Sequence, residues 1–265
     1  MRERIKSSNE IVIKVGTSTL THANGSLDLQ RIDVLSRVLC DLKNAGKRIV
    51  LVSSGAIGVG RNKMHIDTRP RTIPEKQALA AMGQVTLMTV YSKFFAEYGC
   101  NAAQILLTAD VINHEESRLN AVNTIHTLYD FNCIPVVNEN DTVATKEIEF
   151  GDNDTLSAIV AGVIGAQTLI ILSDIDGLYS DDPHTNPNAQ LISQIDTIDD
   201  NVRAMCKGSA SSLGTGGMAT KLHAAEIGWE HGVDTVLING EDPKLIYDVL
   251  NGEDIGTYFR AKERN

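Results

Sequence analysis

Short apolar runs rich in β-branched residues alternate with longer segments of helical periodicity, and this alternation constrains the fold more than any other feature. Six runs are predicted as strands: 11–15, 48–53, 103–107, 134–138, 168–172 and 235–238. Their apolar residues are continuous rather than placed at every second position, which is typical of strands covered on both faces of a parallel sheet. The sequence therefore predicts an α/β fold, a three-layer α/β/α sandwich around a mostly parallel sheet.

The segments between these runs space their apolar residues as helices do. The predicted helices are 29–42, 74–98, 156–164 and 218–231. Pro74 suits the first turn of its helix. Gly46 and Gly165 follow two of the helices at positions where a left-handed C-terminal cap is common. We expect a single domain over residues 1–265, with a boundary between two functional lobes near residue 170.

Composition and charge exclude several classes of protein. A hydrophobic content of 42% supports a core, but no apolar run is long enough to span a membrane. The first ten residues, MRERIKSSNE, lack the apolar stretch of a secretory signal. The net charge of −10 argues against a broad nucleic-acid surface. Four scattered cysteines without a CxxC motif fit buried thiols better than disulfides. We expect a cytoplasmic protein with neither nucleic-acid nor membrane partners.

Lysines beside small residues lie near both ends of the chain. The stretch GTGGMATK, residues 214–221, places three glycines and two threonines ahead of Lys221, and Lys14 interrupts an apolar run just before Gly16. Glycine lets backbone N–H groups approach an anion closely, and a lysine adds a positive charge. Together they predict a site for a phosphorylated ligand, with phosphoryl transfer as the first hypothesis. Taken alone, Lys14 also fits an edge strand or a lysine whose ammonium reaches solvent.

Two better-known nucleotide motifs partly match this glycine-rich stretch. It is not a P-loop, because Thr220 rather than a glycine precedes Lys221. Residues 214–219 match the GxGxxA form of a dinucleotide fingerprint, but the preceding KGSASSL makes a poor strand. Asp234, the downstream acid, precedes a strand instead of ending one. A glycine loop that leads into a helix and contacts nucleotide phosphates fits these residues better.

Small and polar residues follow the second predicted strand in VSSGAIGVGR, residues 52–61. The strand ends in Ser53, Ser54 and Gly55, with Gly58 and Gly60 close behind. Small residues at a strand end leave room for a ligand and offer N–H and hydroxyl donors. The same residues also fit an ordinary strand-to-helix turn.

Carboxylates and amides gather in NENDTVAT, residues 138–145, and in FGDNDTLSA, residues 150–158. Acids suit an ammonium group, while amides and hydroxyls suit a carboxylate, so the combination predicts an amino-acid substrate. The alternative for residues 152–154 is a helix N-terminal cap, which only one of them can provide. The stretch 172–183 is either a surface turn or a flank of the adenine or ribose of a nucleotide.

Taken together, these segments resemble the amino acid kinase family, and within it the glutamate 5-kinase branch. The resemblance runs from about residue 9 to 259 and rests on IVIKVGTSTL, VSSGAIGVGR, QALAAMGQ, NENDTVA, FGDNDTLSA, SDIDGLY and SLGTGGMATK. NENDTVA followed by FGDNDTLSA is specific to this branch. The resemblance implies an eight-stranded sheet. It also implies transfer of a phosphoryl group from ATP to the side-chain carboxylate of L-glutamate, the first step of proline synthesis.

By matching positions, the resemblance also implies roles for individual residues. Lys14 and Lys221 would contact the transferring phosphoryl group, held in place by Asp154. The glutamate-binding residues of the N-terminal lobe, about 1–170, would be Ser54, Asp141 and Asn153, with Asp152 and Asn138 close by. The ATP-binding residues, mostly in the C-terminal lobe of about 171–265, would be Lys14, Ser173, Asp174, Thr215, Gly216, Gly217, Met218, Ala219, Thr220 and Lys221. Mg²⁺ would bind through the nucleotide phosphates, without a metal site of the protein's own.

This chemistry asks for positioning and charge stabilisation more than for covalent catalysis. An ionised carboxylate is already a nucleophile, so no general base is required. The resemblance further implies a homodimer or homotetramer, and feedback inhibition by proline helped by residues 64–73. Many bacterial members carry a C-terminal domain of PUA type. Because the sequence ends at Asn265, we expect none here.

Three alternatives remain open from the sequence. Acetylglutamate, aspartate, carbamate and UMP kinases of the same family share the use of two lysines. A non-catalytic amino-acid or nucleotide sensor could use the same fold, although the presence of Lys14, Lys221 and Asp154 counts against it. A dinucleotide-dependent oxidoreductase is the third alternative.

Overall fold

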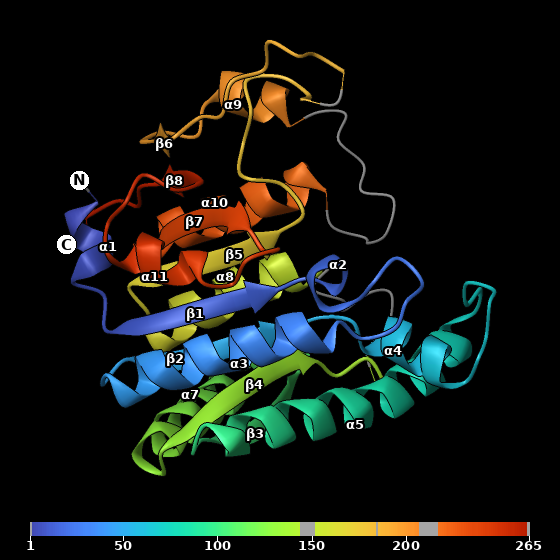
Figure 1. The fold of residues 1–265 in the computed structure, drawn as a ribbon. Coiled ribbons are helices and arrows are strands. Elements are labelled where there is room, and N and C mark those ends of the chain that lie inside the picture. Colours follow the sequence, from blue (N-terminus) through green and yellow to red (C-terminus); the bar gives the residue numbers. More distant parts are fainter. Residues whose placement is uncertain (1, 144–151, 184, 207–216, 264–265) are drawn as a thin grey trace.

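An eight-stranded sheet lies at the centre of the molecule, in the order β3-β4-β2-β1-β5-β7-β8-β6 (Figure 1). The structure, a computed structural model, describes residues 2–143, 152–183, 185–206 and 217–263. Its strands are β1 (Glu10–Val15), β2 (Arg48–Ser53), β3 (Asn101–Leu107), β4 (Cys133–Glu139), β5 (Thr168–Ser173), β6 (Gln194–Ile195), β7 (Asp234–Asn239) and β8 (Thr257–Phe259). Paired strands are parallel except for β7 and β8. The predicted α/β architecture with a mostly parallel sheet is confirmed.

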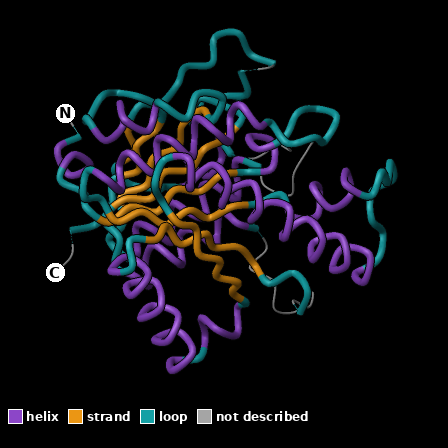
Figure 2. Tube along the Cα trace, turned by 60° about the horizontal axis from the view of Figure 1, so that its bottom comes forward, coloured by secondary structure: helices purple, strands orange, loops and turns teal. Residues whose placement is uncertain are grey.

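Helices cover both faces of this sheet (Figure 2). They are α1 (Glu3–Lys6), α2 (Thr17–Leu20), α3 (Leu29–Asn44), α4 (Ala56–Lys63), α5 (Ile73–Glu97), α6 (Ala109–Asn113), α7 (Glu115–Asp130), α8 (Asn153–Ile164), α9 (Asp200–Met205), α10 (Met218–Glu230) and α11 (Leu245–Leu250). Among the helices in the described segments, none has the length and apolar character needed to cross a bilayer.

Two apolar cores form, one on each face, because successive side chains of a strand point to opposite sides of the sheet. On β1, Ile11, Ile13 and Val15 belong to the core that α3 and α5 cover. Val12 belongs to the core that α8 and α10 cover. The same alternation assigns Lys14 to the face of Val12, near the carboxyl end of the strand. A lysine therefore occupies a position whose register neighbours are apolar.

Glycines and polar caps end the helices near the predicted positions. Gly46 after α3 has φ 90°, and Gly165 after α8 has φ 79°, so both adopt the left-handed conformation that glycine tolerates. Helix α5 begins with a capping box, in which the Thr72 side chain accepts from the Glu75 N–H and the Glu75 carboxylate accepts from the Thr72 N–H. In the sequence pattern, Pro74 alone predicts this start.

The strands β6 and β8 were not predicted as individual elements. They contain two and three residues, which is too short for a periodic apolar pattern. Strand β8 runs antiparallel to β7, with Tyr258 opposite Val236. The buried guanidinium of Arg2 stabilises the segments just before β6 and β8, because it donates to the carbonyls of Ile255 and Ser193 at 2.5 and 2.9 Å.

Helices α4 and α5 cross where two glycines face each other's backbone. A Cβ atom on Gly60 would lie 2.0 Å from the carbonyl oxygen of Leu79, and one on Gly83 would lie 1.8 Å from that of Ala56. No side chain fits at either position. The sequence places Gly60 just behind a strand end with small residues, but its missing side chain permits the helix contact.

Candidate active site

Four parallel strands end at one edge of the sheet and bring predicted site residues together. In register, Lys14 of β1 lies between Val52 of β2 and Ile171 of β5. Ser54 follows β2 directly, and Asn138 lies near the end of β4. The carboxyl ends of parallel strands are the usual place for ligands in open α/β sheets. Because β1 is central in the sheet, the alternative of an edge-strand lysine is wrong for Lys14.

Asp154 lies between the two predicted lysines. Its Oδ1 atom is 2.5 Å from Lys14 Nζ, and its Oδ2 atom is 3.3 Å from Lys221 Nζ. The Thr220 hydroxyl also donates to Oδ2, at 2.9 Å. All three charged side chains are buried, with 1% of Asp154, 6% of Lys14 and 7% of Lys221 exposed. Residues from β1, α8 and α10 thus form one buried ionic cluster.

The charge of Asp154 persists in spite of its burial. Desolvation alone would raise the pKa of this carboxyl group, because a buried charge loses its hydration. The ammonium groups of Lys14 and Lys221, together with hydrogen bonds from Lys14 and Thr220, outweigh desolvation and hold the pKa of Asp154 below its usual value. The carboxylate is therefore ionised at neutral pH.

The cluster carries more positive than negative charge, in a chain whose net charge is −10. Among the residues that the structure describes, two ammonium groups face one carboxylate in this cluster, which leaves capacity for an anion. Lys221 lies in the first turn of α10, where the helix dipole disfavours a cation. Gly16 lies close to Lys14, because a Cβ atom on Gly16 would be 3.4 Å from Lys14 Nζ. As a glycine, it places no side chain beside the ammonium group. A buried, uncompensated positive charge with open backbone beside it is suited to bind a phosphoryl group.

A chain of polar side chains adjoins this cluster through Asn153, the residue before Asp154. The Asn153 Nδ2 atom donates to Ser54 Oγ at 2.9 Å, to Asn138 Oδ1 at 2.8 Å and to the Ser53 carbonyl at 3.1 Å. Asn153 therefore contacts two other predicted glutamate-binding residues directly. They connect the ends of β2 and β4 to the start of α8.

Two further residues join these polar side chains, and the sequence predicts neither of them as a site residue. Gln84 of α5 accepts from Asn138 Nδ2 at 3.0 Å and donates to Gln104 Oε1 at 3.2 Å. Tyr91 of α5 is buried, and its hydroxyl lies 2.9 Å from Ser53 Oγ. Burial raises the pKa of Tyr91. The spacing of α5 predicts a helix but not which of its polar residues reach the neighbouring strand ends.

Asp152 and Asp141 lie at the same edge in different settings. Asp152 is the N-terminal cap of α8, because its carboxylate accepts from the Thr155 N–H at 2.8 Å. The cap expected among residues 152–154 is therefore Asp152. Asp141 is half-buried in the turn after β4, where the Val143 N–H donates to the Asn140 carbonyl. Its role in binding stays a prediction.

Apart from Lys14 on β1, the predicted ATP-binding residues that the structure describes lie at the carboxyl end of β5 and at the start of α10. The Ser173 hydroxyl donates to Asp174 Oδ1 at 3.0 Å, with Ser173 buried and Asp174 exposed. Residues 217–221 form the cap and first turn of α10. Thr215 and Gly216 lie outside the described residues. Within the described segments, no group of three or more His, Cys, Asp or Glu side chains is arranged to hold a metal ion.

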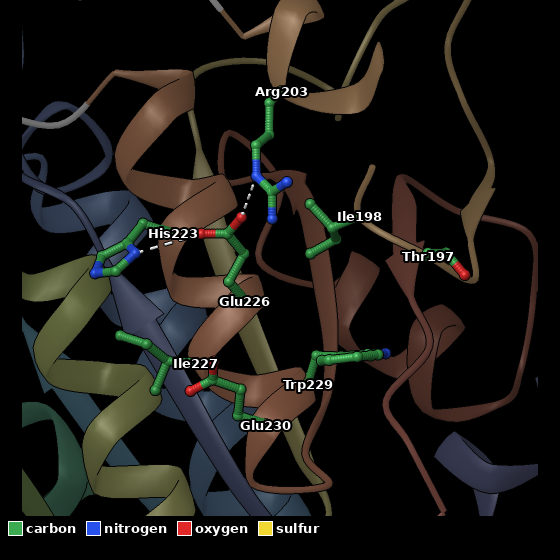
Figure 3. Close-up of a pocket in the computed structure, with 8 residues that line it drawn as sticks. All are labelled: Thr197, Ile198, Arg203, His223, Glu226, Ile227, Trp229 and Glu230. Carbon is green, nitrogen blue, oxygen red and sulfur yellow. Dashed lines mark hydrogen bonds and ion pairs between the residues drawn. The ribbon is translucent and has the colours of Figure 1, made fainter. Parts of the chain in front are cut away.

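A separate hollow lies on another side of α10, beside α9 (Figure 3). Glu226 of α10 pairs there with Arg203 of α9 at 2.9 Å and with His223 at 3.5 Å. Ile198 and Trp229 supply its apolar walls. None of these residues was predicted as part of the site. The Arg203–Glu226 pair joins the two helices that flank residues 207–216.

Comparison with known proteins agrees with this fold. The family model described as "Amino acid kinase family" matches residues 9–239, and the chain belongs to this family. It is 52% identical to a protein of Clostridium perfringens named "Glutamate 5-kinase", over 99% of both chains. It is 50% identical to a protein of the same name from Enterococcus faecalis, over 98% of this chain and 97% of that one. The solved structure of carbamate kinase from Giardia lamblia bound to AMP-PNP shares the fold, with a TM-score of 0.67, 18% identity and coverage of 97% and 100%.

Proposed function

We propose that this protein is a glutamate 5-kinase, which transfers the terminal phosphoryl group of ATP to the side-chain carboxylate of L-glutamate. The observation that carries the proposal is the buried cluster of Lys14, Asp154 and Lys221, which has excess positive charge and adjoins the amide side chain of Asn153. The excess positive charge suits a phosphoryl group, and the Asn153 amide suits an amino acid. The name and the identity of 52% shared with the Clostridium protein support the choice of glutamate.

In the proposed reaction, an oxygen of the glutamate side-chain carboxylate forms a bond to the γ-phosphorus while the bond from that phosphorus to the β,γ-bridging oxygen breaks. ADP leaves with the electron pair, and no proton needs to be removed from the nucleophile. Lys14 and Lys221 neutralise charge that spreads over the phosphoryl oxygens. Asp154 is a positioning residue, because it holds both ammonium groups by ion pairs.

The two substrates are assigned to the two lobes. Ser54, Asn138 and Asn153, with Asp141 and Asp152 nearby, would bind glutamate in the lobe of residues 1–170. The nucleotide would bind in the lobe of residues 171–265, against Ser173, Asp174 and the stretch 215–221. The N-terminus of α10 supports this assignment, since its N-cap residue is Gly217, which has no side chain to accept from the first N–H groups of the helix.

Mg²⁺ would bind together with ATP, through the nucleotide phosphates rather than at a metal site of the protein's own. The donor set fits this mode, because the carboxylate nearest the lysines, Asp154, is already engaged by Lys14, Lys221 and Thr220. Bound in this way, the ion would supply further positive charge to the phosphoryl oxygens.

Further proposals concern regulation and setting. We infer a cytoplasmic homodimer or homotetramer that is inhibited by proline. Proline would compete at the glutamate site, helped by residues 64–73 between α4 and α5. Initial rates at low glutamate test the inhibition: saturating proline should lower them, and unchanged rates would refute it.

The reaction is tested with Mg-ATP, hydroxylamine and a panel of acceptors. An acyl phosphate reacts with hydroxylamine to give a hydroxamate, so L-glutamate should yield a hydroxamate signal that Lys221→Ala abolishes. Aspartate and N-acetylglutamate are run beside it, with UMP scored by ADP release. Product with another acceptor alone would move the substrate to a different member of the family. Silence with every acceptor would favour a non-catalytic sensor.

A further inference from the structure

The Asn153 side-chain oxygen, a hydrogen-bond acceptor, lies beside a donor, the Ser54 hydroxyl group. The nitrogen of the same side chain is engaged by Ser53, Ser54 and Asn138. Its oxygen receives no hydrogen bond from any residue in the described segments. Ser54 Oγ is an acceptor in this contact, so its own proton stays available to a ligand. An acceptor next to a donor matches an ammonium group next to a carboxylate.

Backbone groups determine this orientation at both ends. The Glu139 N–H can only donate, and it lies 2.9 Å from Asn138 Oδ1, so the Asn138 oxygen must face it. The Ser53 carbonyl can only accept, and it lies 3.1 Å from Asn153 Nδ2, so the Asn153 nitrogen must face that carbonyl. A flip of either amide would set donor against donor or acceptor against acceptor.

Gln84 completes this arrangement from the helix side. The Asn138 oxygen accepts from the Glu139 N–H. The Asn138 Nδ2 atom then needs an acceptor of its own, because only 3% of Asn138 is exposed to water. Gln84 Oε1 supplies that acceptor at 3.0 Å. The preceding residue, Gly83, lies at the crossing of α5 with α4, where its missing side chain lets the backbones touch. The helix contact thus determines where Gln84 lies.

We propose that Gln84 is a positioning residue for the amino-acid site, acting through Asn138 on Asn153. Together with the backbone of Ser53 and Glu139, it holds the Asn153 amide with its oxygen free of the other described residues. The site can then accept a charge-assisted hydrogen bond from a free α-ammonium group, and it discriminates against an acylated, uncharged amino group. The inference rests on the proposed phosphorylation of glutamate. It adds a residue that need not touch the substrate and a reason for specificity.

Three variants separate this role from a merely structural one. Gln84→Met keeps the length and helix preference of the side chain but removes the acceptor for Asn138. Gln84→Glu keeps an acceptor at the same place. Gln104→Met removes only the outer hydrogen bond, since Gln104 contacts Gln84 and is itself exposed.

The experiment measures kcat and KM for L-glutamate and N-acetyl-L-glutamate at saturating Mg-ATP, together with the shift in melting temperature that L-glutamate alone produces. We expect Gln84→Met to raise the KM for glutamate roughly five- to tenfold, the effect of about one lost hydrogen bond, and to change kcat less than about twofold. Its preference for glutamate over the N-acetyl compound should fall by a similar factor. The glutamate-induced thermal shift should shrink, while Gln84→Glu and Gln104→Met stay near the wild type.

Each outcome decides the proposal. A Gln84→Met protein with unchanged KM and unchanged preference would overturn it, as would a Gln84→Glu protein that behaves like Gln84→Met. A wild type that phosphorylates glutamate while the variants do not differ would refute the role of Gln84 and leave the proposed function standing. A wild type that prefers N-acetylglutamate, or uses neither acceptor, would refute both.

Discussion

Lys14 Nζ lies 2.5 Å from Asp154 Oδ1, although Lys14 belongs to the first strand and Asp154 to α8. The same carboxylate reaches Lys221 with its other oxygen. One acid therefore fixes two cations from distant parts of the chain. The geometry implies that both lysines are in place before a phosphorylated ligand arrives, which is the preorganisation that electrostatic catalysis requires.

Replacing either lysine should reduce turnover far more than stability. We expect Lys14→Met and Lys221→Met to lower kcat roughly 10²–10³-fold, because each removes one positive charge from the transferring group. Lys93→Met, which changes an exposed lysine of α5, serves as the matched control. Steady-state rates and thermal melts on the same samples test this. A loss of activity in Lys14→Met that is no larger than its loss of folded protein would show that Lys14 has only a structural role.

Asp154 should make stability depend on pH in a defined direction. Its folded-state pKa lies below its usual value of 3.8, so its contribution is present above about pH 4 and is lost as the pH falls through the lower, folded-state value. Asp154→Asn lacks this contribution at every pH and leaves two buried ammonium groups unpaired, at a cost of about 3 kcal/mol near neutral pH.

Urea unfolding of the wild type and of Asp154→Asn between about pH 7 and pH 3 tests the assignment. The difference in unfolding free energy should shrink as the pH falls. A difference that stays constant over this range would show that the carboxylate is not held by the two lysines.

Two glycines of α4 should respond oppositely to alanine. Gly60→Ala should lower the free energy of unfolding by about 1–3 kcal/mol, because the new Cβ would overlap the Leu79 carbonyl. At Gly58, the nearest atom to a new Cβ is Thr17 Cγ2 at 3.6 Å, which is an ordinary contact. Gly58→Ala should be neutral or stabilise by up to about 1 kcal/mol, since alanine favours helices. Equal melting temperatures for the two variants would contradict this account of the helix crossing.

Sequence periodicity was sufficient for most of the fold. The six predicted strands are all present, and Gly46 and Gly165 end their helices as expected. Continuous apolar runs identify buried strands because both faces of such strands are covered. The short strands β6 and β8 were missed because hydrogen bonding to neighbouring strands, rather than a local pattern, defines them.

The site was predictable in its residues but not in its connections. Motif resemblance identified Lys14, Asn153 and Asp154, and these lie together in the structure. The motif QALAAMGQ ends in Gln84 but did not identify it as a site residue, since hydrogen-bond partners between α5 and β4 depend on how the helix crosses the strand ends. The role of Gly60 was not predictable for the same reason, because a glycine that permits a turn and one that permits a helix contact look alike in a sequence.

The most direct test of the account follows oxygen from the substrate to the product. L-Glutamate labelled with ¹⁸O in its side-chain carboxylate is incubated with the protein, Mg-ATP and hydroxylamine, and the released phosphate is analysed by mass spectrometry. If the carboxylate attacks the γ-phosphorus, hydroxylamine then displaces phosphate from the acyl carbon, and each phosphate carries one ¹⁸O. Phosphate without the label would mean that water, and not the glutamate carboxylate, accepts the phosphoryl group, and would contradict the proposed function.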